Sequence, residues 1–286
     1  MIKHIREAMN LSQQDLADRL GVSFSTINRW ENRKSKPTKL AQNSVFELVR
    51  SSGVDVSGFI YDRIKKAAGC VDTSGKRIVL YHGSKSGIKG DIAPISRDKC
   101  DFGKGFYMGT IPEQPLTLIC DYPQSKFYIV SIDLSGLKKT CITPDINWAL
   151  LVALKRGKMD EIAGTDFYNK IVSLSSGYDV ITGSIANDRM FFVLDNFFQG
   201  NITDTALVES LSALNLGQQV VAVTQKSCDK VRIEKEIELS YFERLILKEK
   251  AETLRLKGIS LANDICRAHR RDGLFFDEIL AKAKEA

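Results

Sequence analysis

Two short amphipathic segments separated by a single glycine constrain the fold of this chain more than any other feature of its sequence. The first begins after Ser12, a residue type that caps helix N-termini well. Gly21 supplies the left-handed turn that lets the chain reverse, and Ser23 caps the second segment. The positions expected to face inward are Leu16, Ala17, Leu20, Ile27 and Trp30. This spacing predicts two short helices that cross closely, Ala17 being small at the crossing.

The pattern resembles the phage-repressor (Cro/CI-like) helix-turn-helix family over about Ile2–Val54. By that resemblance, the second helix enters the major groove of DNA, while residues around it meet phosphates. The residues expected to contact DNA are Gln13, Ser23, Ser25, Thr26, Asn28, Arg29, Arg33 and Lys34, with Lys36 and Lys39 just beyond. The alternatives are a helix bundle with a solvated basic face and a module that contacts a partner protein.

The charge distribution points to the same region. Residues 1–70 hold 12 of the 41 Lys and Arg but only seven of the 35 Asp and Glu, which places +5 of the net +6 there. The rest of the chain is close to neutral. A polyanionic partner is therefore expected at the N-terminal region.

Composition excludes several classes of protein. A chain of 286 residues with 43% hydrophobic and 27% charged residues is typical of a globular protein of about two domains. It lacks the run of about 20 apolar residues that a membrane span needs, and its start lacks the features of a signal peptide. The six cysteines are scattered without any Cys-x-x-Cys pair, which favours a cytoplasmic protein with no metal and no disulfide framework.

Three regions differ in their pattern. Residues 1–70 predict an all-α helix-turn-helix bundle with a linker, residues 76–239 a mixed α+β domain, and residues 240–286 a charged helical extension. Strands and helices do not alternate regularly in the middle region, which disfavours a doubly wound parallel sheet. The strands expected there are Arg77–Tyr81, a strand ending at Tyr107, Lys126–Leu134, Tyr178–Thr182, Gln219–Thr224 and Val231–Leu239.

The middle region carries four motifs in a fixed order. They are Tyr-His-Gly-Ser at 81–84, Asp-Phe-Gly-x-Gly-Phe-Tyr at 101–107, Tyr-Asp-x-Ile-x-Gly followed by Ala-Asn-Asp-Arg at 178–189, and Gln-x-Val at 219–221. No Gly-x-Ser-x-Gly elbow, phosphate loop or Cys/His cluster competes with them. Chemistry in this chain is therefore expected at these four motifs.

Together the motifs resemble an uncharacterised bacterial family in the ADP-ribosyltransferase superfamily, of the His-Tyr-Glu lineage, over about Arg77–Leu239. The resemblance implies a split mixed sheet and NAD as substrate. It also implies cleavage of NAD to nicotinamide and transfer of ADP-ribose to a macromolecule, either a protein or a nucleic acid. Such cleavage builds positive charge on the ribose, as in glycoside cleavage.

The resemblance also assigns site residues. His82 would bind a ribose hydroxyl, Gly83 the nicotinamide amide, and Tyr107 would stack on the nicotinamide ring. Gln219 occupies the position that usually carries Glu, and Arg189 is a candidate for an NAD phosphate. The alternatives are structural: a strand-end histidine, a core aromatic, a strand-edge amide, and capping by Asn187 or Asp188 of the helix that follows.

These expectations combine into a DNA-binding, NAD-dependent ADP-ribosyltransferase in a toxin–antitoxin or phage-defence setting. An antitoxin or other regulatory protein is then a candidate partner, and reading a palindrome would require a homodimer. Because Gln219 carries no charge, the alternative is a transcriptional regulator whose inactive domain senses a nucleotide or binds a partner. The acceptor of the ADP-ribosyl group leaves no motif in the sequence.

Overall fold

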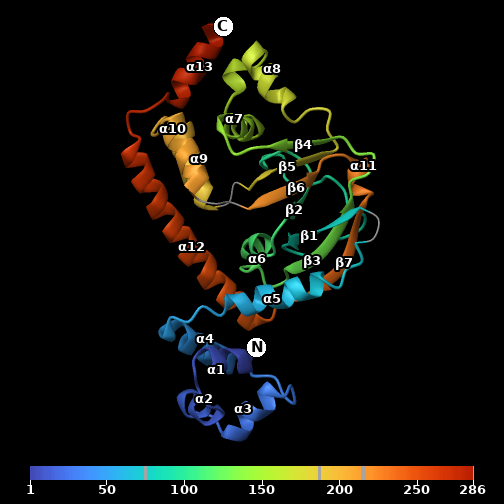
Figure 1. Ribbon diagram of the computed structural model, residues 1–286, viewed down its shortest axis with the longest axis vertical. Coiled ribbons are helices and arrows are strands. Elements are labelled where there is room, and N and C mark those ends of the chain that lie inside the picture. Colours follow the sequence, from blue (N-terminus) through green and yellow to red (C-terminus); the bar gives the residue numbers. More distant parts are fainter. Residues whose placement is uncertain (74–75, 186–187, 214–216, 286) are drawn as a thin grey trace.

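The computed structural model describes residues 1–73, 76–185, 188–213 and 217–285, apart from the side chains of residues 188–191. Figure 1 shows a helical bundle at one end of the molecule and a sheet covered by helices at the other. The helices of the bundle are α1 (Ile2–Ala8), α2 (Gln13–Leu20), α3 (Phe24–Glu31), α4 (Lys39–Ser52) and α5 (Ser57–Ala68). The all-helical prediction for this region is confirmed.

The strands within the described residues form one seven-stranded sheet in the order β4-β5-β6-β2-β1-β3-β7. Their bounds are β1 (Arg77–Ser84), β2 (Phe106–Gly109), β3 (Lys126–Asp133), β4 (Lys139–Ile142), β5 (Val180–Ser184), β6 (Gln218–Ala222) and β7 (Val231–Ile237). Among these seven described strands, only β4 and β5 pair in parallel, so the expected mixed α+β sheet is confirmed. β4 was not predicted.

The sheet divides into two halves, β4-β5-β6-β2 and β1-β3-β7. Strands β1 and β2 join them through the single residue pair Tyr81 and Gly109, whereas β1 and β3 pair along their whole length. The two halves can therefore carry different layers of helices on the same side of the sheet.

Helices cover one face of the sheet. They are α6 (Glu113–Ile119), α7 (Ile146–Lys155), α8 (Asp166–Ser173), α9 (Asp188–Phe198), α10 (Asp204–Ala213), α12 (Tyr241–Ala268) and α13 (Phe276–Glu285), with the short η1 (Asp160–Ile162) and α11 (Gln225–Cys228) between elements. On the half that contains β5 and β6, Ile181 and Val221 pack with the fully buried Trp148 of α7. The opposite face buries Phe106 and Tyr128 beneath loop residues such as Ile88.

The long helix α12 runs along one side of the molecule, from the N-terminal bundle to α9 and α10 (Figure 1). It begins with a capping box in which Ser240 and Glu243 satisfy each other's backbone amides. Glu243 also accepts a 2.6 Å bond from Arg63 of α5, and Tyr241 donates a 2.9 Å bond to Asn43 of α4. The C-terminal helix is thereby fixed to the N-terminal bundle.

One hydrophobic core joins all three regions of the chain. Its members from the bundle, the sheet and α12 include Ile60, Phe127 and Ile246, each buried. Helix α6 lies at the same junction, where Glu113 bonds Lys65 of α5 at 2.8 Å. The helical bundle is therefore packed against the α+β region and is not held by a linker alone.

Candidate nucleic-acid interface and ligand cavity

The turn between α2 and α3 is built as the sequence predicts. The Ser12 side chain accepts a bond from the amide of Asp15, whose carboxylate bonds the Ser12 amide in return. Gly21 ends α2 in the left-handed conformation with φ of 65°, and Ser23 caps α3. Because these caps need only neighbouring residues, the crossing angle of the two helices is set locally.

Helix α3 buries one face and exposes the other. Ile27 packs fully buried against Leu16 and Ala17 of α2. On the outer side Ser23, Ser25 and Arg29 are exposed, whereas Thr26 and Asn28 are half-buried. Sequence reasoning missed Phe24, whose side chain is 48% exposed at the start of α3. The sequence feature that could have identified Phe24 is an aromatic residue directly after the cap, because an apolar side chain at that position can contact a thymine methyl group.

Four of the cations expected at the DNA surface lie on or beside this face. Arg29, Arg33, Lys34 and Lys36 are exposed, and among the described residues no ion pair is found for any of them. Arg33 has a positive φ of 58°, which turns the chain out of α3. Exposed, unpaired cations beside a helix with polar outward side chains are the composition of a DNA-binding surface.

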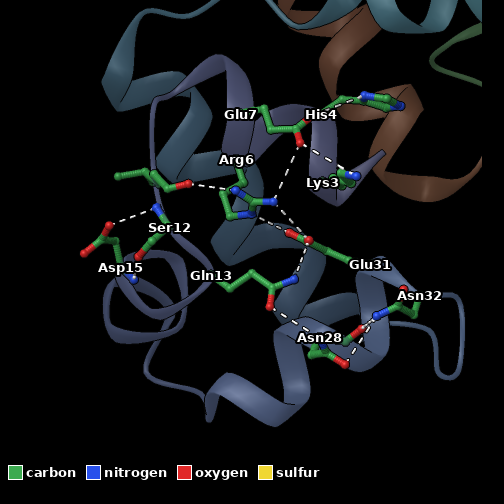
Figure 2. A network of polar contacts seen from close by, with 11 residues as sticks. Lys3, His4, Arg6, Glu7, Ser12, Gln13, Asp15, Asn28, Glu31 and Asn32 are labelled. Carbon is green, nitrogen blue, oxygen red and sulfur yellow. Dashed lines mark hydrogen bonds and ion pairs between the residues drawn. The ribbon is translucent and has the colours of Figure 1, made fainter.

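Figure 2 shows a polar network behind the same face. Arg6 of α1 donates to both carboxylate oxygens of Glu31, at 2.7 and 3.2 Å. Gln13 donates to Glu31 at 2.7 Å and accepts a 3.4 Å bond from Asn28. Gln13 is therefore half-buried and bonded within the protein, which the sequence did not reveal.

The end of β1 borders a cavity of about 460 Å³ on the loop-covered face of the sheet. The His82 ring stacks on Phe106 at 4.3 Å between centroids, and its Nδ1 lies 2.7 Å from the carbonyl oxygen of Tyr107. Since a carbonyl only accepts, Nδ1 carries the proton and Nε2 of the neutral ring is an acceptor. Burial lowers the pKa of His82, although the bond to Tyr107 raises it in part.

Gly83 follows at the same cavity, but its backbone is tightly packed on the other side. A Cβ atom there would lie 2.7 Å from the carbonyl oxygen of Pro115 and 2.8 Å from Ile119 Cγ2. The approach of α6 therefore requires a glycine at this position, whatever the cavity binds.

His82, Tyr107 and Gln219, which the resemblance assigns to one NAD site, do not share one cavity. Tyr107 borders the His82 cavity, but in the register of β2 it pairs with Val221, while the preceding Phe106 packs with His82. Since successive strand residues point to opposite faces, the Tyr107 ring points to the helix-covered face and the imidazole to the other. Gln219 lies on the Tyr107 face and does not line the cavity.

Tyr107 and Gln219 are instead bonded within the protein. The Tyr107 hydroxyl donates to the carbonyl oxygen of Gly103 at 2.7 Å and accepts a bond from the Phe102 amide. Burial raises the pKa of Tyr107 well above its ordinary value. The buried Gln219 donates 3.0 Å bonds to Asp101 and to the carbonyl oxygen of Ser184.

Asp101 completes this buried group by pairing at 3.0 Å with Arg156, the residue that follows α7. The sequence showed Asp101 only as part of a glycine-rich motif, and no signal linked it to Arg156. The side chain of Arg189, the candidate for an NAD phosphate, lies outside the described residues, as does Asn187.

Two negative observations concern the described part of the chain. Within it, no group of three or more His, Cys, Asp or Glu side chains could hold a metal ion. None of its helices combines the length and apolar character needed to cross a membrane.

The fold and the outer face of α3 define a helix-turn-helix protein with a second, mixed α+β region. Residues 2–40 match the family described as "Helix-turn-helix". Residues 78–233, more than half of the chain, match the family described as "Protein of unknown function (DUF3990)", and the chain belongs to that family. No curated protein and no solved structure matches it.

Proposed function

We propose that the protein is a transcriptional regulator that binds double-stranded DNA by placing α3 in the major groove. The exposed row Ser23, Ser25 and Arg29, beside the exposed Arg33 and Lys34, carries this proposal. Polar and guanidinium side chains on one helix face can read base edges, while cations beyond it neutralise phosphates. The helix-turn-helix match over residues 2–40 supports it.

A binding experiment with Arg29→Ala tests this proposal. The probe is the duplex that the wild-type chain enriches from a randomised pool. We expect the substitution to weaken binding to that duplex by about tenfold or more, because a bidentate arginine–base contact contributes about 1–3 kcal/mol. Arg50→Ala, at an exposed position of α4, is the control. Equal affinity of wild type and variant for selected and random duplexes would contradict it.

A second proposal concerns the α+β region, in which the His82 cavity binds NAD as the substrate of ADP-ribosyl transfer. The observation that favours it is an open cavity of about 460 Å³ at a His-Gly strand end, with Lys85 and Lys89 at its border. Two lysines suit the diphosphate of a dinucleotide. The division of the sheet between β1 and β2 agrees with the split sheet that the resemblance implies.

In the proposed reaction, the bond between nicotinamide and ribose breaks and nicotinamide leaves with the electron pair. A nucleophile on the acceptor macromolecule forms the new bond to the ribose carbon and loses its proton. His82 would bind a ribose hydroxyl through Nε2. The proposal rests on His82 and Gly83, since the Gln219 amide is bonded to Asp101.

Nicotinamide release and NAD binding by the full chain distinguish the readings. Nicotinamide release by the wild type that His82→Ala abolishes supports transfer at this cavity. Binding of NAD without release, abolished by His82→Ala, supports a nucleotide-sensing regulator, which the Gln219–Asp101 bond favours. Neither binding nor release, with candidate acceptors present, would leave a partner-binding domain, such as one that binds an antitoxin.

A further inference from the structure

In the polar network behind α3, one carboxylate determines which atom of each neighbouring amide donates a hydrogen bond and which accepts one. Glu31 closes α3, and its side chain is only 4% exposed. Arg6 holds it by two hydrogen bonds, and these together with the bond from Gln13 lower its pKa, although burial alone would raise it. An ionised carboxylate can only accept hydrogen bonds.

Because Glu31 only accepts hydrogen bonds, the amides of Gln13 and Asn28 each have one permitted orientation. Because Glu31 only accepts, Gln13 must turn its Nε2 toward it, at 2.7 Å, and its Oε1 away. Asn28 must then offer Nδ2 to Gln13, at 3.4 Å, and its Oδ1 faces Asn32, which donates at 3.3 Å (Figure 2). Each carboxamide retains a second hydrogen or lone pair for an outside partner.

The network also adds little net negative charge to the face proposed to contact DNA. A lone carboxylate at the end of α3 would repel phosphates, but Arg6 lies on both of its oxygens. Gln13 and Asn28 are half-buried, so each residue is bonded within the network and still partly exposed. Bidentate recognition of adenine by a carboxamide needs a fixed order of donor and acceptor, and a flipped amide would lose it.

We propose that Glu31 is a positioning residue for DNA recognition: through Gln13 it fixes the order of donor and acceptor that Asn28 presents in the major groove. This inference rests on the DNA-binding function proposed above. Glu31 itself does not touch DNA, and its effect on sequence preference passes through Asn28.

The test is Glu31→Gln in the full chain, with affinity measured for the selected duplex, for single base-pair changes of it and for a scrambled duplex. The introduced amide has one oxygen, which Arg6 takes, so its NH2 group faces Gln13. Gln13 and Asn28 must then both flip. We expect the ratio of selected to scrambled affinity to fall about tenfold, at the same base pair that Asn28→Ala relaxes, with scrambled binding unchanged.

Two comparisons separate positioning from a structural role. In an Asn28→Ala background, Glu31→Gln should cause no further loss of the ratio. Glu47→Gln removes a carboxylate that is 60% exposed on α4 and pairs only with Arg50 among the described residues, so it controls for the change of charge. An unchanged ratio in Glu31→Gln, or an equal loss with and without Asn28, would overturn the inference.

If Glu31→Gln does not fold, as judged by urea unfolding, Gln13→Met interrupts the same relay and keeps the pair of Arg6 and Glu31. It should lower the ratio about tenfold in the wild type and leave it unchanged beside Asn28→Ala. A loss that is uniform over all duplexes would overturn the inference while leaving DNA binding intact. Failure of the wild-type chain to enrich any duplex would instead overturn the proposed function.

Discussion

At the scale of single residues, the packing of α6 against β1 requires a glycine at position 83, in addition to any requirement of the cavity that Gly83 borders. A Cβ atom at this position would lie 2.7 Å from the Pro115 carbonyl oxygen. We expect Gly83→Ala to destabilise the protein by about 1–3 kcal/mol, because β1 or α6 must move to admit the methyl group. The measurement is urea unfolding followed by circular dichroism.

Gly58 provides the matched control. It lies in the first turn of α5, and a Cβ atom there has no neighbour within 4 Å. Gly58→Ala should therefore leave the free energy of unfolding unchanged or raise it by up to about 1 kcal/mol. An equal loss in both variants would show that the contact with α6 is not the cause.

His82 makes stability depend on pH. Burial lowers its pKa below the unfolded value of about 6.5, so the unfolded chain takes up the proton first. The stability that the neutral His82 ring contributes is fully present above about pH 6.5 and is lost as the pH falls below that value. We expect the free energy of unfolding of the wild type to fall more than that of His82→Gln when the pH is lowered from 7.5 to 5.

The same comparison with His4→Gln, at an exposed position, accounts for the loss of one histidine as such. A difference between wild type and His82→Gln that stays constant with pH would mean that the imidazole keeps an ordinary pKa in the folded chain. The measurement is the urea dependence of unfolding at each pH.

Residues whose partners are near in sequence were predictable, and distant ones were not. Ser12 and Ser23 bond amides three residues away, so composition and spacing identified both caps. Gln219 bonds Asp101 across 118 residues. The alternation of residues along the strand predicted that Gln219 faces away from Val220, as it does. No nearby residue, however, indicates which buried carboxylate Gln219 bonds.

At the scale of elements, all six expected strands are present, and their ends lie within a few residues of the expected ones. Runs of β-branched or aromatic residues made these strands recognisable. β4 was missed for the opposite reason. It is a four-residue edge strand, Lys139–Ile142, with alternating exposure and one neighbour, the parallel β5. Short edge strands depend on pairing rather than on their own composition.

Helix α12 offers a prediction at this scale. Ser240→Ala removes the side chain that accepts from the Glu243 amide and leaves the capping box incomplete. We expect a loss of about 1 kcal/mol in the free energy of unfolding. Ser260→Ala, at an exposed position within the same helix, should be neutral or slightly stabilising. A similar loss in both would contradict a specific role of the cap.

At the scale of the whole molecule, the three regions differ in composition but share a core. The sequence shows helix-turn-helix spacing, strand runs and a charged helix, each recognisable alone. It does not show that Ile60 of the bundle and Ile246 of α12 pack together with Phe127 of the sheet. Apolar residues on a helix face indicate burial, but not the partner that buries them.

This shared core predicts that the chain unfolds as one unit. The only two tryptophans, Trp30 and Trp148, lie in the bundle and in α7. Trp30→Phe and Trp148→Phe leave one fluorescent reporter in each variant. In each variant, the urea transition followed by tryptophan fluorescence should coincide with the transition followed by circular dichroism. The reason is that neither end of the molecule can unfold without exposing the core that both ends share.

Ile246→Ala makes the prediction stricter. Ile246 is 4% exposed within the shared core, so its truncation should cost about 2–5 kcal/mol. In a cooperative unit that cost lowers the transition midpoint reported by Trp30 and by Trp148 equally. If only one reporter shifts, or if Trp30 reports a separate transition at lower urea, the bundle is an independent unit. The α+β region would then have no energetic coupling to α2 and α3 through packing.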